Sequence, residues 1–129
     1  MKKLLDQFDV VDNVKVQDID TADITGTYVP VGSYTTGYAM LLTEALGATK
    51  KATISVMQRL GAAGAEKIVG EAVEITHPTQ FAEISFNISD LDIAGGYDRV
   101  ALKITCDAAA TPKKFGAGVL MLGGKRYAG

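Results

Sequence analysis

The sequence has few of the residues from which most catalytic and metal sites are built. Its 129 residues include one cysteine, one histidine and no tryptophan. The single cysteine, Cys106, excludes an intramolecular disulfide bond and suits a reducing compartment. One histidine and one cysteine are too few for the ligand set of a structural zinc site. We therefore expect no catalytic residues, no cofactor and no bound metal.

Long apolar runs and a strong charge bias are also missing. Charged residues make up 22% of the chain, and the net charge is −2. No apolar run approaches the length of about 20 residues that a membrane-spanning helix needs. The first residues begin like a signal peptide, but Asp6, Asp9 and Asp12 interrupt its apolar segment. With no basic surface for nucleic acid, we expect a chain that binds neither membrane nor nucleic acid.

The sequence around His77 and Cys106, the two potentially reactive residues, does not favour catalysis. His77 precedes Pro78 in a predicted turn, and the sequence has no G-x-S-x-G motif that would supply a nucleophile for it. Cys106 falls on the apolar face of a predicted strand, which indicates a buried structural thiol. Neither residue is therefore predicted to be catalytic.

Two other clusters allow more than one interpretation. Asp90, Asp92 and Asp98 could hold calcium, but they do not match the spacing of the twelve-residue calcium loop, so helix capping and turn formation explain them better. The stretch 123–125 lacks the spacing of a phosphate-binding loop. Residues 125–127, Lys-Arg-Tyr, could contact a partner or form a solvated tail.

Strand and turn signals follow one another from Gly26 onward. The clearest is 81–89, where Ala82, Ile84, Phe86 and Ile88 alternate with polar residues. No helical crossover is present that could join parallel strands. The pattern predicts an all-β fold, an antiparallel β-sandwich or small barrel of about seven strands. The expected strands are 27–31 at an edge, 37–46, 51–60, 67–76, 81–89, 97–107 and 119–122.

The same alternation predicts which side chains form the core. The runs 37–46 and 119–122 are apolar on both faces, as central strands are, and a lone small sandwich would struggle to cover both faces. A short helical turn is expected at Ser89–Asp92, with Ser89 as its cap. The expected core residues are Ile54, Val56, Ile84, Phe86, Val100, Leu102 and Ile104.

Residues 1–23 differ in composition from the rest of the chain. They contain six aspartates but no glycine or proline, with valines and one isoleucine scattered among them. We interpret 1–23 as an extended N-terminal arm that orders against a partner, and 24–129 as the β-sandwich domain. The alternative is that the stretch is a first strand packed on its own domain. The aspartates are Asp6, Asp9, Asp12, Asp18, Asp20 and Asp23.

Four short motifs give the chain a family resemblance. They are the small-residue loop 62–67, the stretch 88–93 around Leu91-Asp92, the closing stretch 123–128 with its Arg-Tyr pair, and 27–31 leading to Gly37-Tyr38. In this order they resemble small virion proteins of tailed bacteriophages, those encoded beside the major capsid protein. The resemblance covers roughly residues 25–128.

The resemblance implies a capsid decoration, or cement, protein located in the virion, on the capsid surface, and made in the host cytoplasm. Its expected partners are the major capsid protein and further copies of itself, a trimer rather than a dimer. A phage tail-tube, head–tail joining or fibre-base subunit is the alternative within the same class. From another class, a carbohydrate-binding module could use the same sandwich, and exposed aromatic residues gathered on one face would favour it.

Overall fold

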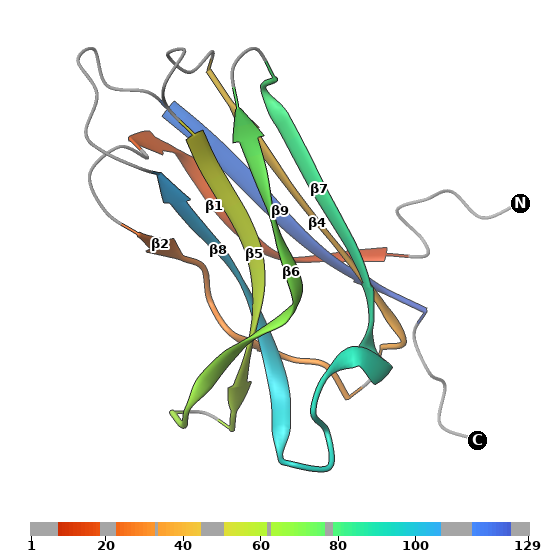
Figure 1. The fold of residues 1–129 in the computed structure, drawn as a ribbon. Coiled ribbons are helices and arrows are strands. Elements are labelled where there is room, and N and C mark those ends of the chain that lie inside the picture. Colours follow the sequence, from red (N-terminus) through yellow and green to blue (C-terminus); the bar gives the residue numbers. More distant parts are fainter. Residues whose placement is uncertain are drawn as a thin grey trace, which may run out of the picture.

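The fold is a sandwich of two antiparallel sheets packed face to face (Figure 1). The structure is a computed structural model. It describes residues 23–32, 34–44, 51–61, 63–76, 79–106 and 115–124, together with the backbone alone of 8–18; of residues 106 and 115 the backbone alone is described. The predicted fold class is confirmed.

The first sheet, sheet A, has the strand order β1-β9-β4-β7. The second, sheet B, has the order β2-β8-β5-β6, with β3 pairing to β8 beside that path. All pairings are antiparallel, in agreement with the absence of helical crossovers from the sequence. The strands are β1 (Phe8–Asp18), β2 (Ile24–Thr25), β3 (Val29–Pro30), β4 (Thr36–Thr43), β5 (Lys51–Leu60), β6 (Glu66–Thr76), β7 (Phe81–Asn87), β8 (Tyr97–Cys106) and β9 (Phe115–Gly123).

The core lies between the sheets and follows the two-residue period of the strands. In β4, for example, Ala39 and Leu41 are fully buried, while Tyr38 and Met40, which alternate with them, are partly exposed. Six of the seven predicted core residues are buried, and the seventh, Ile84, is partly buried against them. The prediction of the core from alternation is therefore confirmed.

Close packing in this core explains one glycine. The ring of Phe86 on β7 lies over Gly37, its cross-strand partner on β4, so that a Cβ at position 37 would overlap the ring. No side chain can occupy that space while the ring stays in place. Gly37 thus makes room for the Phe86 ring in the core.

The first strand pairs within the chain. β1 lies antiparallel to β9 from Phe8↔Gly123 to Asp18↔Phe115, with two irregularities in register. Residues 8–18 therefore form the edge strand of sheet A on their own domain, which is the alternative that the sequence left open. The boundary between an arm at 1–23 and a domain at 24–129, and any contact of this segment with a neighbour, stay predictions.

The short helical turn exists but starts earlier than expected. The 3₁₀ turn η1 (Ile88–Asp90) is capped by Asn87, whose backbone N–H donates to Asp90 Oδ2 at 2.9 Å, rather than by Ser89. Strand β7 accordingly ends at Asn87. The last strand, β9, begins at Phe115, four residues before the apolar run that predicted it.

Candidate functional site

The outer side of sheet A carries a continuous apolar surface. Strands β7, β4 and β9 place three rows of side chains there, because cross-strand partners point to the same side of a sheet. Tyr38, Met40 and Leu42 with their cross-strand partners make nine positions, of which Ser85 and Glu83 on β7 are polar; the next partners in these rows, Thr36 and Asn87, are polar as well. We call the other seven the apolar face: Tyr38, Met40, Leu42, Phe81, Ala117, Val119 and Met121.

Part of the apolar face is open to solvent. Leu42 is 53% exposed and Phe81 is 41% exposed, while Met40, Val119 and Met121 are partly buried. Sequence analysis predicted that both central strands would be apolar on two faces, and the positions of β4 and β9 in the middle of sheet A agree with that. Large contiguous exposed apolar surfaces are often sites of protein–protein contact, which makes this face a candidate interface.

Sheet B differs from sheet A in the chemistry of its outer side. Along β5 and β8 the cross-strand pairs are Arg59↔Arg99, Met57↔Ala101, Ser55↔Lys103 and Thr53↔Thr105. Charged and hydroxyl side chains therefore predominate where sheet A has methionine, leucine and valine. This contrast makes the outer side of sheet A the better candidate for an interface.

A groove of about 530 Å³ lies at one end of the apolar face. Tyr38, Met40 and Met121 supply apolar walls, while Asn87 at the end of β7 and Asp90 at the end of η1 supply polar atoms. Unbranched methionine side chains adapt to differently shaped apolar partners. The groove can therefore receive an apolar side chain from a docked protein.

Tyr38 and Glu83 form the one polar pair on this surface for which the structure shows a hydrogen bond. The Tyr38 hydroxyl donates to Glu83 Oε2, and this hydrogen bond is the main cause that raises the pKa of Tyr38 to about 12. The tyrosine therefore stays neutral at physiological pH.

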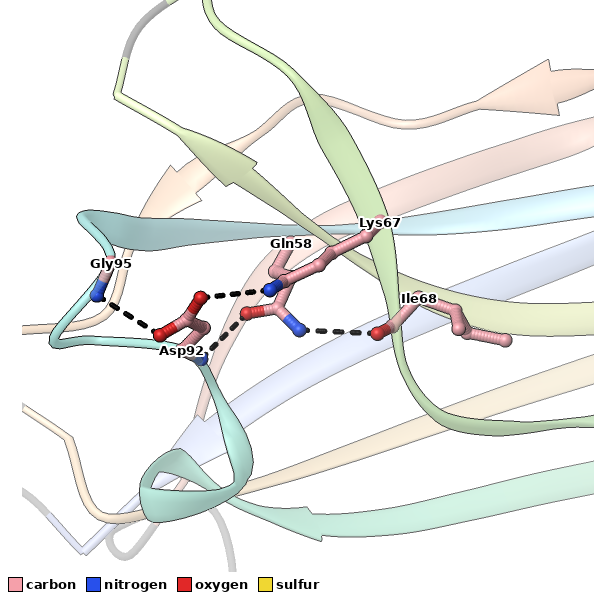
Figure 2. Close-up of polar contacts among 5 residues, drawn as sticks. All are labelled: Gln58, Lys67, Ile68, Asp92 and Gly95. Atoms are coloured by element: carbon pink, nitrogen blue, oxygen red, sulfur yellow. Dashed lines mark hydrogen bonds and ion pairs between the residues drawn. The ribbon is translucent and has the colours of Figure 1, made fainter.

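A second group of polar contacts lies at the end of the sandwich, between the β5–β6 turn and the loop after η1 (Figure 2). Gln58 is 4% exposed and makes two hydrogen bonds: its Oε1 accepts from the Asp92 N–H at 2.8 Å, and its Nε2 donates to the Ile68 carbonyl at 3.1 Å. Asp92 also accepts from Lys67 Nζ at 2.8 Å and from the Gly95 N–H at 3.0 Å. The group fastens the loop to sheet B.

These contacts bear on the suggested calcium ligands. Asp92 accepts from Lys67 and Gly95, Asp90 accepts from the N–H of the η1 capping residue Asn87, and Asp98 lies 3.9 Å from Arg99 Nε. No group of three or more His, Cys, Asp or Glu residues that could hold a metal ion occurs among the described residues. Capping and turn formation, the explanation preferred from sequence, account for Asp90 and Asp92.

The Asp92 contacts predict a pH dependence of stability. Its hydrogen bonds from Lys67 and then from Gly95 lower the pKa of the Asp92 carboxyl. The folded protein therefore binds this proton less tightly than the unfolded chain does. The ionised Asp92 carboxylate accordingly stabilises the fold at neutral pH, and this stabilisation is lost as the pH falls through the lowered pKa. We expect Asp92→Asn to be less stable than the parent at neutral pH but equal to it in strong acid. Denaturant unfolding at both pH values measures this, and a constant difference would contradict it.

Several residues singled out from the sequence lie outside the described structure. They are His77, the side chain of Cys106, and residues 125–127. Gly124, just before that last stretch, has a φ of +66°, and its carbonyl accepts a hydrogen bond from Thr35 Oγ1 at 3.0 Å. No helix in the described part of the chain is long and apolar enough to cross a membrane.

Sequence reasoning missed two features. The first is the buried position of Gln58. It lies two residues after Val56 and four after Ile54, and so on the inner side of β5 with them. The Arg59↔Arg99 pair depends on the register between strands 40 residues apart, which no local pattern reveals. Of these two features, the sequence could indicate only the first, through the even spacing of Gln58 from Ile54 and Val56.

No protein-family model matches the chain, and no curated protein matches it in sequence. Among solved structures, the chain is similar to the coat protein of Tobacco streak virus, with 15% identity and a TM-score of 0.38, over 100% of this chain and 94% of that chain. At that TM-score and identity, the likeness shows neither a common family nor a common function.

Proposed function

We propose that the chain is a structural virion protein: a capsid decoration protein that binds the outside of a phage head and stabilises it. The observation that carries the proposal is the apolar face of sheet A, which the chain leaves partly exposed and which suits a protein partner. The resemblance of residues 25–128 to phage virion proteins supports the choice of partner. The proposed role is binding rather than catalysis.

The composition of the apolar face favours a protein partner over a glycan. Methionine, leucine, valine and alanine make up five of its seven positions, and Tyr38 and Phe81 are its two aromatic residues. Carbohydrate recognition relies on flat aromatic side chains with polar groups around them, whereas protein interfaces accept aliphatic and methionine side chains. We therefore place a protein surface on this face, supplied by the major capsid protein.

The proposal includes self-association. Shell sites of decoration proteins lie on local symmetry axes, and each weak contact gains from repetition over the shell. We propose a symmetric homo-oligomer, a trimer rather than a dimer. A tail-tube or head–tail joining subunit would instead assemble into a ring without binding the head surface, so the oligomeric state separates the two roles.

Placing a charge in the middle of the apolar face tests this function. We expect Met40→Asp to weaken binding to empty shells of the neighbouring major capsid protein by at least tenfold, because the interface would bury an unpaired carboxylate. Co-sedimentation with the shells measures the binding, and sedimentation velocity measures the oligomeric state of the free protein.

A matched control is available on the other sheet. Met57→Asp makes the same change in the middle of the outer side of sheet B, on a strand that is equally central. It should bind shells like the parent protein. If the parent is a monomer that never co-sediments with shells, the decoration function is wrong; if both variants bind like the parent, the apolar face is not the interface.

A further inference from the structure

Two arginines face each other across the outer side of sheet B. Arg59, near the end of β5, is the cross-strand partner of Arg99 on β8. Directly opposed side chains in an antiparallel pair have Cβ atoms roughly 4.5–5.5 Å apart, and like charges in that arrangement are destabilising. The pair therefore requires compensation by negative charge.

Arg59 has that compensation within the chain. Its guanidinium carbon lies 4.1 Å from the centroid of the Tyr28 ring, and its Nε donates to the Gly61 carbonyl at 3.2 Å. Glu66 on β6 is its cross-strand partner on the other side. After burial, the same Glu66 is the main cause that raises the pKa of Tyr28, which places its charge beside Tyr28 and Arg59.

Arg99 lacks an equivalent partner. Its cross-strand partner on β3 is Pro30, whose side chain carries no charge. The carboxylate in contact with it, Asp98 Oδ1, stands 3.9 Å from the Arg99 Nε on a side chain that is 59% exposed. Among the described residues that Nε has no hydrogen-bond partner although it is buried, while 31% of the whole Arg99 side chain remains exposed. A buried donor without a partner is uncommon in folded proteins and calls for an explanation.

We propose that Arg99, with Arg59 beside it, is a binding site for a carboxylate of an acidic protein segment. A guanidinium presents parallel N–H donors that match the two oxygens of a carboxylate, and a second arginine at the adjoining position strengthens the site electrostatically. The bound carboxylate supplies Arg99 with the close negative partner that Arg59 already has in Glu66. A bound carboxylate also accounts for the pairing of two positive side chains across β5 and β8.

An acidic protein segment fits this site better than a nucleic acid. Protein surfaces that bind nucleic acid carry a stripe of positive side chains. Here the cross-strand row Arg99–Arg59 continues on β6 with the acidic Glu66, and the chain has a net charge of −2. The site also lies on the opposite sheet from the apolar face. A protein docked on sheet A therefore leaves Arg99 accessible to a second partner, and the inference stands whether or not the first partner is a capsid.

The test compares Arg99→Met with Lys103→Met in the full chain. Methionine keeps the apolar stem of Arg99 and removes its charge, and Lys103 lies on the same side of β8 with a partner of its own, Asp23, at 3.9 Å. The probe is a tetra-aspartate peptide, with tetra-asparagine and inorganic phosphate as the other arms, all at one ionic strength. NMR titration following the Arg99 Nε–H resonance gives the dissociation constants.

We expect tetra-aspartate to shift the Arg99 Nε–H resonance, to bind at least tenfold more weakly to Arg99→Met, and to bind Lys103→Met like the parent. Tetra-asparagine should not bind. Arg99→Met should be at least as stable as the parent in chloride buffer, because the opposed charges are relieved. Tighter binding of phosphate than of tetra-aspartate, equal binding by both variants, or a marked loss of stability in Arg99→Met would each overturn the proposal.

Discussion

Phe86→Ala is expected to lower the free energy of unfolding by about 3–5 kcal/mol, the usual cost of removing a buried phenylalanine ring. The side chain is 7% exposed, and its ring fills the space over Gly37. Because Gly37 has no side chain to move into the vacated volume, the cavity cannot close by a local rearrangement on β4. Urea unfolding monitored by circular dichroism measures the loss.

Phe81→Ala is the matched control for this prediction. Phe81 lies at the other end of the same strand, β7, but on the outer side of sheet A, and it is 41% exposed. Its truncation removes the same atoms without opening a cavity in the core, so the loss of stability should be much smaller. Equal losses in the two variants would mean that Phe86 does not occupy the core position assigned to it.

The strands that could be predicted from sequence are those whose pattern is local. In β5 and β8 the inward residues recur at every second position, and turn residues mark the strand ends. The predicted bounds of these two strands therefore agree with the observed ones to within a residue or two. The apolar face was foreseen as two runs without polar alternation, because a strand central in a sheet with apolar residues on both sides shows no two-residue period.

The remaining features depend on partners distant in sequence. The two-residue strand β2 (Ile24–Thr25) is defined only by its pairing with β8, and β1 only by its pairing with β9. Residues 8–18 are rich in valine but also in aspartate, so local propensity does not decide between a strand and an arm. The Gln58 contacts and the Arg59↔Arg99 pair likewise require the register between strands, which alternation alone leaves open.

Removal of residues 1–23 is expected to leave the remaining strands folded but to cost several kcal/mol of stability. The deletion removes β1, which pairs with β9 from Phe8 to Asp18, and each net backbone hydrogen bond contributes roughly 0.5–1.5 kcal/mol. It also turns β9, a central strand, into an open edge that can pair with other chains. Denaturant unfolding and sedimentation velocity should therefore show a less stable protein that self-associates.

The same truncation bears on the proposed function. If the first strand of one copy adds to the β9 edge of a neighbour, as strand addition allows, the truncated protein should bind shells more weakly than the intact one. A synthetic peptide of residues 8–18 should then restore both the stability and the shell binding, whereas a scrambled peptide of equal composition should restore neither. Co-sedimentation with empty shells measures the binding in each case. If the truncated protein binds shells as well as the intact protein, the first strand serves its own domain alone.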